Sequence, residues 1–182
     1  MAKYSDFFNN NDTCSLGDFN EYFISNVDPN DDDSIFECAE MFNCLGNNKE
    51  ILLNMVRKGL QDPSNFQADS ITSAQTLYIE NTANKDAGYD LRFSIWSPLK
   101  VGALVNEAEW FSYGMAHNHD FNLLTQTVIG KGYTTEIYQV MNNYKGYVGE
   151  NVDIEFSSEI ALLPNRVLLY QAEKDIHIQK EV

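Results

Sequence analysis

The pattern of apolar positions changes from helical to strand-like near residue 76. In residues 1–75, apolar side chains recur at the three- and four-residue intervals of amphipathic helices. The pattern predicts one helix after a capping Ser15 and then a second helix. Residues 29–33 are either a loop or the start of this second helix, and residues 34–37 have capping-box spacing. A third predicted helix is closed by Asp62-Pro63.

After residue 76 the chain consists of short apolar runs between turns rich in Gly, Asn and Pro. In residues 89–96, for example, apolar and polar side chains alternate, as on a strand with one buried face. Many short strands of this kind are typical of a sandwich or barrel, so we expect a mainly β fold. The predicted strands are 76–80, 89–96, 110–114, 121–129, 133–140, 152–156, 159–163, 166–172 and 176–180.

Length and composition are those of a folded globular protein, with 182 residues of which 43% are hydrophobic and 13% aromatic. The formal net charge of −15 argues against binding to nucleic acids or anionic membranes, which would repel this surface. The sequence contains no apolar run long enough for a membrane span and no signal-peptide core near its start. Three cysteines without C-x-x-C spacing favour a reduced, cytoplasmic protein.

The candidate chemistry comes from the three histidines of the chain. His117 and His119 are separated by one residue at the end of a strand-like run, and His177 lies in a later run. Because residues i and i+2 of a strand share a face, the first two imidazoles can enter one cavity and the third can join them from another strand. Imidazole is the commonest protein ligand for Fe, Zn, Ni and Cu. The histidines therefore predict a mononuclear metal site, and ordinary half-buried histidines are the alternative.

These residues resemble the two motifs of the cupin superfamily. The first motif has H-x-H at a strand start and then a glycine-bearing turn, which corresponds here to His117-Asn118-His119 and Gly130-Lys131-Gly132. The second motif has a turn, a strand and a histidine, which corresponds to residues 164–170 and His177. Asn165 stands at the position of the usual glycine.

The resemblance covers residues 89–180 and implies a double-stranded β-helix, or jelly-roll, barrel. Residues 76–182 would form this barrel, and residues 1–75 would be an N-terminal helical cover within one compact unit. Many cupins carry a glutamate four or five residues after the second histidine, where this chain has Leu123 and Leu124. A site of three histidines is similar to that of the thiol dioxygenase branch. The resemblance therefore implies Fe(II), with Zn, Ni or Mn as alternatives.

Further candidates for substrate binding and proton transfer lie on the predicted strands. Arg92 can clamp a substrate carboxylate, and Gln179 shares the expected strand face of His177. Glu136 is either a further ligand or partner of the metal site or a solvated strand residue, and a tyrosine near iron can donate a proton. The candidate catalytic residues are Tyr113, Glu136 and Tyr138, and the candidate substrate-binding residues are Arg92, Gln126, Tyr170 and Gln179.

The expected function is a metal-dependent oxygenase that oxidises a small acid, amino acid, thiol or peptide side chain with O2. One alternative is a cupin isomerase, epimerase or lyase that uses its metal without redox chemistry. A second alternative is a metal-binding or interaction protein without catalysis. The expected partners are a small-molecule or peptide substrate and O2. Because the sequence given ends soon after His177, an open strand edge there makes a homodimer one way to complete the barrel.

Overall fold

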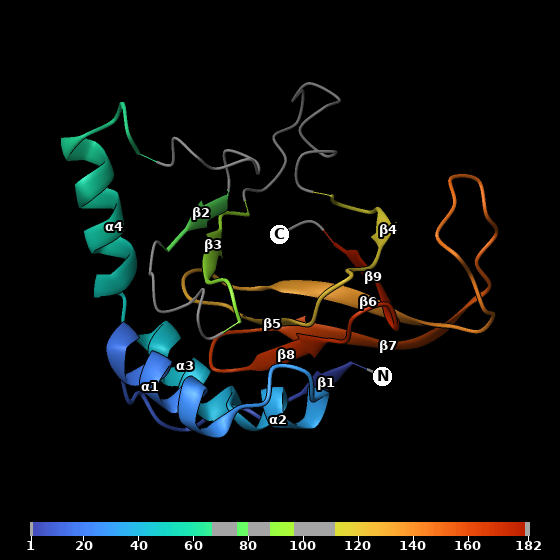
Figure 1. Ribbon diagram of the computed structural model, residues 1–182, viewed down its shortest axis with the longest axis horizontal. Coiled ribbons are helices and arrows are strands. Elements are labelled where there is room, and N and C mark those ends of the chain that lie inside the picture. The colour runs from blue at the N-terminus through green and yellow to red at the C-terminus, as the bar shows by residue number, and fades with distance from the viewer. Residues whose placement is uncertain (1, 67–75, 80–87, 97–111, 181–182) are drawn as a thin grey trace. The chain divides into compact units, whose positions relative to one another are not determined.

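The computed structural model describes residues 2–66, 76–79, 88–96 and 112–180 (Figure 1). The chain divides into two compact units, of which the first contains Met1–Phe8 and Pro98–Val182 and the second contains Asn9–Ser97. The described part is mainly β, with antiparallel sheets and four helices. The predicted boundary at residue 75 lies outside the described residues, so the division into a helical cover and a barrel stays a prediction.

The first unit contains two antiparallel sheets, with strand orders β1-β8-β5 and β4-β9-β6-β7. Their strands are β1 (Lys3–Tyr4), β4 (Ala116–His117), β5 (Leu123–Gln126), β6 (Tyr133–Val140), β7 (Ile154–Leu162), β8 (Val167–Tyr170) and β9 (Asp175–Gln179). The expectation of a mainly β fold is confirmed. Among the strands that the structure describes, both sheets are open and no barrel is closed.

The two sheets of the first unit contribute to one hydrophobic core. Leu168 and Tyr170 of β8 pack in a cluster with Ile137 of β6 and with Ile160 and Leu162 of β7. Each of these side chains is at most 3% exposed. Because burial of a large apolar side chain contributes about 1.5–3 kcal/mol, this cluster holds the inner faces of the sheets against each other.

The predicted strands 152–156 and 159–163 are one continuous strand, β7. Its register against β6 shifts between Ile137 and Tyr138, which pair with Ser158 and Phe156, so that Ser157 is one extra residue. A β-bulge accommodates such a residue without ending the strand. The polar Ser157-Ser158 pair therefore marks an irregularity within a strand and not the turn that the sequence suggested.

Two predicted turns adopt the left-handed backbone that their residues allow. Gly132, between β5 and β6, has φ +82°, and a Cβ built there would lie 2.0 Å from the carbonyl oxygen of Leu162. Only glycine fits such a position. Asn165, between β7 and β8, has φ +63°, a conformation that asparagine tolerates better than most residues. It thus adopts a backbone conformation that glycine most often supplies.

The N-terminal residues differ from the predicted helical cover, because Lys3–Tyr4 form strand β1. Lys3 pairs with Leu169 in an antiparallel ladder with β8, so this segment belongs to the β unit. The Arg166 guanidinium lies 4.5 Å from the ring centroid of Tyr4 and 5.1 Å from that of Phe7. These cation–π contacts add to the ladder and fix the segment in place.

The second unit contains the helices. The predicted cap of α1 (Leu16–Asn26) is confirmed, since Ser15 and Asp18 form a capping box. Of the two starts that the sequence left open, the one within residues 29–33 is observed, because Asp31 caps the helix by accepting a hydrogen bond from the backbone N–H of Asp33. The Ser34 hydroxyl accepts from the backbone N–H of Asp28 instead.

The predicted second helix is divided at Cys38, which ends one helix and begins the next. The remaining elements of this unit are α2 (Asp32–Glu37), α3 (Ala39–Asn47), α4 (Glu50–Gln61), β2 (Thr76–Tyr78) and β3 (Arg92–Ser94), and the two strands pair antiparallel. The third predicted helix corresponds to α4 and ends before Pro63, as expected. Within the described residues, no helix has the length and apolar character to cross a membrane.

Candidate metal centre

Two of the three histidines are neighbours across a pair of strands. β4 pairs antiparallel with β9, and His117 lies opposite His177 in this register. Their ring centroids are 4.1 Å apart. Because directly opposed residues have Cβ atoms about 5 Å apart, the strand pairing itself brings these two imidazoles together.

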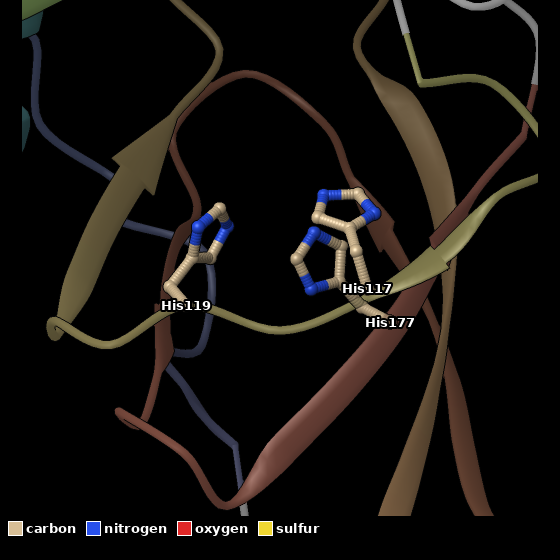
Figure 2. Close-up of side chains that lie close together, drawn as sticks. All are labelled: His117, His119 and His177. Atoms are coloured by element: carbon tan, nitrogen blue, oxygen red, sulfur yellow. The ribbon is translucent and has the colours of Figure 1, made fainter. Parts of the chain in front are cut away.

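His119 reaches the same point from the loop after β4. The prediction that both residues of the H-x-H step lie on a strand is correct only for His117, where β4 ends. The His119 ring centroid lies 5.4 Å from that of His117 and 5.2 Å from that of His177. It also packs against the Phe121 ring, at 4.9 Å. Figure 2 shows the three rings in one group, and one nitrogen from each lies within 4.8 Å of the others. The predicted convergence is confirmed.

The spacing is close to that of three ligands on one ion. With metal–nitrogen bonds of about 2.1 Å, nitrogens on adjacent coordination positions lie about 3–3.4 Å apart. Side-chain rotations that close the group by about 1–2 Å would complete such a site. Within the part of the chain that the structure describes, no carboxylate or thiolate joins the group. The group therefore offers an ion three imidazole nitrogens and no charged ligand.

The hydrogen bonds of the group leave nitrogen lone pairs available. Nδ1 of His117 lies 3.0 Å from the carbonyl oxygen of Met115. Because a carbonyl only accepts, Nδ1 carries a proton. In the neutral imidazole the lone pair is therefore on Nε2, an arrangement common in metal-binding histidines. His177 is 3% exposed, and no described residue offers a partner to its buried Nδ1. An unpaired buried nitrogen is costly, and a bound ion would satisfy it.

His177 is held in its neutral form. Burial, and then the nearby His117 and His119, lower the pKa of His177 to about 3 from its ordinary 6.5. A neutral imidazole can bind a cation near pH 7 without first losing a proton. The buried Tyr170 ring is stacked on His177, with centroids 4.1 Å apart and planes inclined by 26°. Burial raises the pKa of Tyr170 well above its ordinary value, so this wall of the site is a neutral phenol.

Three of the predicted site residues lie beside the histidines. Tyr170 contacts His177 directly. Gln179 follows His177 on the same buried face of β9, and its buried Nε2 has no hydrogen-bond partner among the described residues. Tyr113 is buried and forms an isolated β-bridge with Gln179. These residues form a polar, largely enclosed wall next to the deepest histidine.

Glu136 and Tyr138 face away from the histidines. Ile137 lies opposite His177 in the register of β6 and β9, so its neighbours along β6 point to the other face of the sheet. On that face the Glu136 carboxylate lies 2.9 Å from the Lys180 ammonium and accepts a 2.9 Å hydrogen bond from the Tyr138 hydroxyl. The hydrogen bonds from Lys180 and Tyr138 lower the pKa of Glu136. This carboxylate is part of an ion pair and does not belong to the described group.

Gln126 also faces away from the site, whereas Arg92 belongs to the other unit. Leu123 is opposite Tyr170 and Gln126 is opposite Val167, so the alternation of β5 puts Gln126 on the face away from Tyr170. Arg92 lies in β3 of the second unit, opposite Tyr78, so its role in substrate binding stays a prediction.

The sequence interpretation missed a polar cleft beside His119. The cleft encloses about 630 Å³ and is lined in part by Asn118, His119 and the loop between β6 and β7. The Asn-Asn-Tyr-Lys-Gly sequence of this loop, residues 142–146, indicated only a turn. Its clustered amide, hydroxyl and amino groups were the available signal. The cleft suits a polar ligand better than an apolar one.

No family model matches the chain, and no significant match was found among curated proteins or among solved structures. The case for a metal centre therefore depends on the geometry and chemistry of the three histidines themselves.

Proposed function

We propose that the first unit binds one divalent transition-metal ion through His117, His119 and His177, and that it is a non-haem Fe(II) oxygenase related to the cupins. The observation that carries the proposal is the convergence of three ligand nitrogens within 4.8 Å. The neutral, buried His177 and the hydrogen-bonded His117 support it, because both are prepared to donate a lone pair.

The ligand set bears on the choice of metal and substrate. Three neutral imidazoles leave a divalent ion with its full charge, which favours anionic substrate groups such as thiolates, carboxylates or enolates. Fe(II) held in this way would supply a point where substrate and O2 meet in a fixed orientation. Zn, Ni or Mn would suit the same nitrogens and would favour chemistry without oxidation.

The residues around the triad would exclude water and orient a ligand. Tyr170 covers one side of His177, and Gln179 supplies a buried amide whose Nε2 is available to donate. Tyr113 lies next to Gln179. The cleft at His119 offers a route for a small polar substrate, such as an acid, an amino acid or a peptide side chain.

A second candidate function is metal binding without catalysis. It is favoured by the position of Glu136 and Tyr138, two of the three predicted catalytic residues, on the opposite face of the sheet. Without them, the described acid–base groups near His177 are the Tyr170 phenol and the carboxyl of Asp175, which shares the buried face of β9.

Metal analysis of protein purified without added metal tests the proposal, with His119→Ala as the matched variant because His119 is only half buried and lies in a loop. The oxygenase predicts about one iron per chain in the wild type, loss of iron in the variant, and O2 uptake with a thiol or amino-acid substrate. Stoichiometric metal without turnover of any substrate would favour the second candidate. Equal metal contents in wild type and variant would contradict both.

A further inference from the structure

The position of His119 depends on contacts between loops. His117 and His177 are fixed by the ladder between β4 and β9, whereas β4 ends at His117 and leaves His119 outside it. A metal centre that needs His119 must therefore hold its loop by other means. The contacts of that loop show how this is done.

A closed set of hydrogen bonds joins His119 to two other loops. The His119 carbonyl accepts a 2.8 Å hydrogen bond from the backbone N–H of Glu173, in the turn between β8 and β9. The Glu173 carbonyl accepts a 3.1 Å hydrogen bond from the Tyr144 hydroxyl. The same hydroxyl accepts a 2.7 Å hydrogen bond from Nδ2 of Asn118, the middle residue of the His-Asn-His step.

The Glu173 peptide occupies an unusual conformation within this set. Its φ is +59°, in the left-handed region that residues other than glycine seldom adopt. A backbone conformation of this kind persists where surrounding contacts hold it. Here the contacts are the hydrogen bonds of its N–H to His119 and of its carbonyl to Tyr144.

The loop that carries Tyr144 has its own supports. It spans residues 141–153 and extends beyond the ends of β6 and β7 (Figure 1). The Glu150 carboxylate accepts hydrogen bonds from the backbone N–H groups of Lys145, at 2.9 Å, and Tyr147, at 3.2 Å. Asn142 accepts a further one from the backbone N–H of Asp153. Tyr144 therefore projects from a loop with an internal framework, and its hydroxyl is a fixed point for Asn118.

We propose that Tyr144 is a positioning residue of the metal centre, and that its hydroxyl holds His119 in place through Asn118 and Glu173. This inference rests on the proposed metal site. The Tyr144 hydroxyl acts through the side chain of Asn118, which precedes His119, and through the Glu173 peptide, whose N–H binds the His119 carbonyl. Groups that orient a metal ligand in this way change metal affinity by about 10–100-fold when they are removed.

A double-mutant cycle tests the role of Tyr144 with Co(II) as the probe, whose visible absorption reports binding. Tyr144→Phe removes only the hydroxyl, and we expect it to weaken Co(II) binding about 10-fold. Tyr147→Phe is the matched control, because this side chain lies in the same loop and is 70% exposed. In a His119→Ala background, Tyr144→Phe should change the affinity less than about 2-fold, because the two changes act through one ligand. Asn118→Ala should reproduce the effect of Tyr144→Phe.

The imidazole Hε1 resonances of the metal-free protein provide a second readout. With three histidines in the chain, each resonance can be assigned, and Tyr144→Phe should displace or broaden that of His119 while leaving that of His177 in place. If Co(II) binds the wild type and Tyr144→Phe equally well, the positioning role is wrong while the metal centre stands. The positioning role would also be overturned if Tyr144→Phe reduced the Co(II) affinity equally in the wild-type and the His119→Ala backgrounds. If the wild type binds no Co(II), the proposed function fails, and the positioning role fails with it.

Discussion

His177 is the most deeply buried of the three histidines, and its surroundings determine its chemistry. Tyr170 is stacked on one side, while the other two imidazoles lie close by. Burial in this environment disfavours the imidazolium, so the side chain stays neutral and keeps a lone pair available. The same burial leaves Nδ1 without a partner among the described residues, which costs stability until a ligand is bound.

The pKa of His177 predicts how the stability of the metal-free protein depends on pH. The folded-state pKa of about 3 lies below the ordinary 6.5, so between these values the unfolded chain binds a proton that the folded chain does not. Stability from this residue is present above pH 6.5 and is lost as pH falls toward 3. Between pH 6.5 and pH 4.5 the free energy of unfolding should fall by about 2–3 kcal/mol through His177 alone.

Urea unfolding of the metal-free protein at several pH values measures this effect. A His177→Gln variant, which lacks the titrating group, is the control for the many carboxylates of the chain. The account predicts a shallower decline of stability in the variant than in the wild type over this interval. Parallel declines would mean that His177 is not buried in its neutral form.

At the scale of single elements, alternation along a strand decides which side chains share the site. Ile137 is opposite His177, and therefore Glu136 and Tyr138 are on the other face of the sheet. Gln179 shares the buried face of His177, as its spacing of two residues predicted. A shift of one residue in register would exchange these faces, which is why the sequence alone could not assign them.

The sequence predicted the elements best where the pattern was local. Residues 133–140 alternate clearly and form β6 over that same range, and Ser15 caps its helix as expected. The strand β1 was missed because two residues carry no periodicity, and its pairing with β8 spans almost the whole chain. The bulge at Ser157 was read as a turn, because polar residues interrupt the alternation in both cases.

The candidate site was predictable in its ligands but not in its surroundings. An H-x-H step and a later strand histidine were visible in the sequence, and their convergence is confirmed. The loop position of His119 depends on contacts between distant segments, as do the hydrogen bond from Asn118 to Tyr144 and the one from Tyr144 to Glu173. Such contacts leave no spacing pattern in the chain.

The turn at Gly132 predicts that alanine substitutions at two neighbouring glycines destabilise the protein to different extents. Gly130 and Gly132 both have positive φ, so an alanine at either position costs about 1 kcal/mol for the backbone alone. At Gly132 the added Cβ would also lie 2.0 Å from the Leu162 carbonyl oxygen, whereas nothing lies within 4 Å at Gly130. Gly132→Ala should therefore destabilise the protein by at least about 2 kcal/mol more than Gly130→Ala.

Thermal and urea unfolding of the two glycine variants measures this difference under identical conditions. Gly130→Ala serves as the control for the conformational cost that both positions share. Equal stabilities would show that the turn does not approach β7 as closely as the structure indicates.

At the scale of the whole molecule, charge complicates the identification of a metal centre. A formal net charge of −15 attracts divalent cations to many surface carboxylates, so bulk metal content alone does not identify the histidines as ligands. An anionic substrate would be repelled by the same surface, and the charges that line the cleft balance, because Lys145 and Lys174 lie there with Asp120 and Glu173. A direct test must therefore observe the imidazole nitrogens themselves.

Titration of the 15N-labelled, metal-free protein with Zn(II), observed through the nitrogen resonances of its three histidines, tests the central claim most directly. Zn(II) is diamagnetic, and coordination shifts the resonance of the bound nitrogen. The account predicts that all three imidazoles respond together and saturate at one equivalent of Zn(II). Unchanged imidazole resonances, or a response from only one histidine, would contradict a metal centre built on His117, His119 and His177.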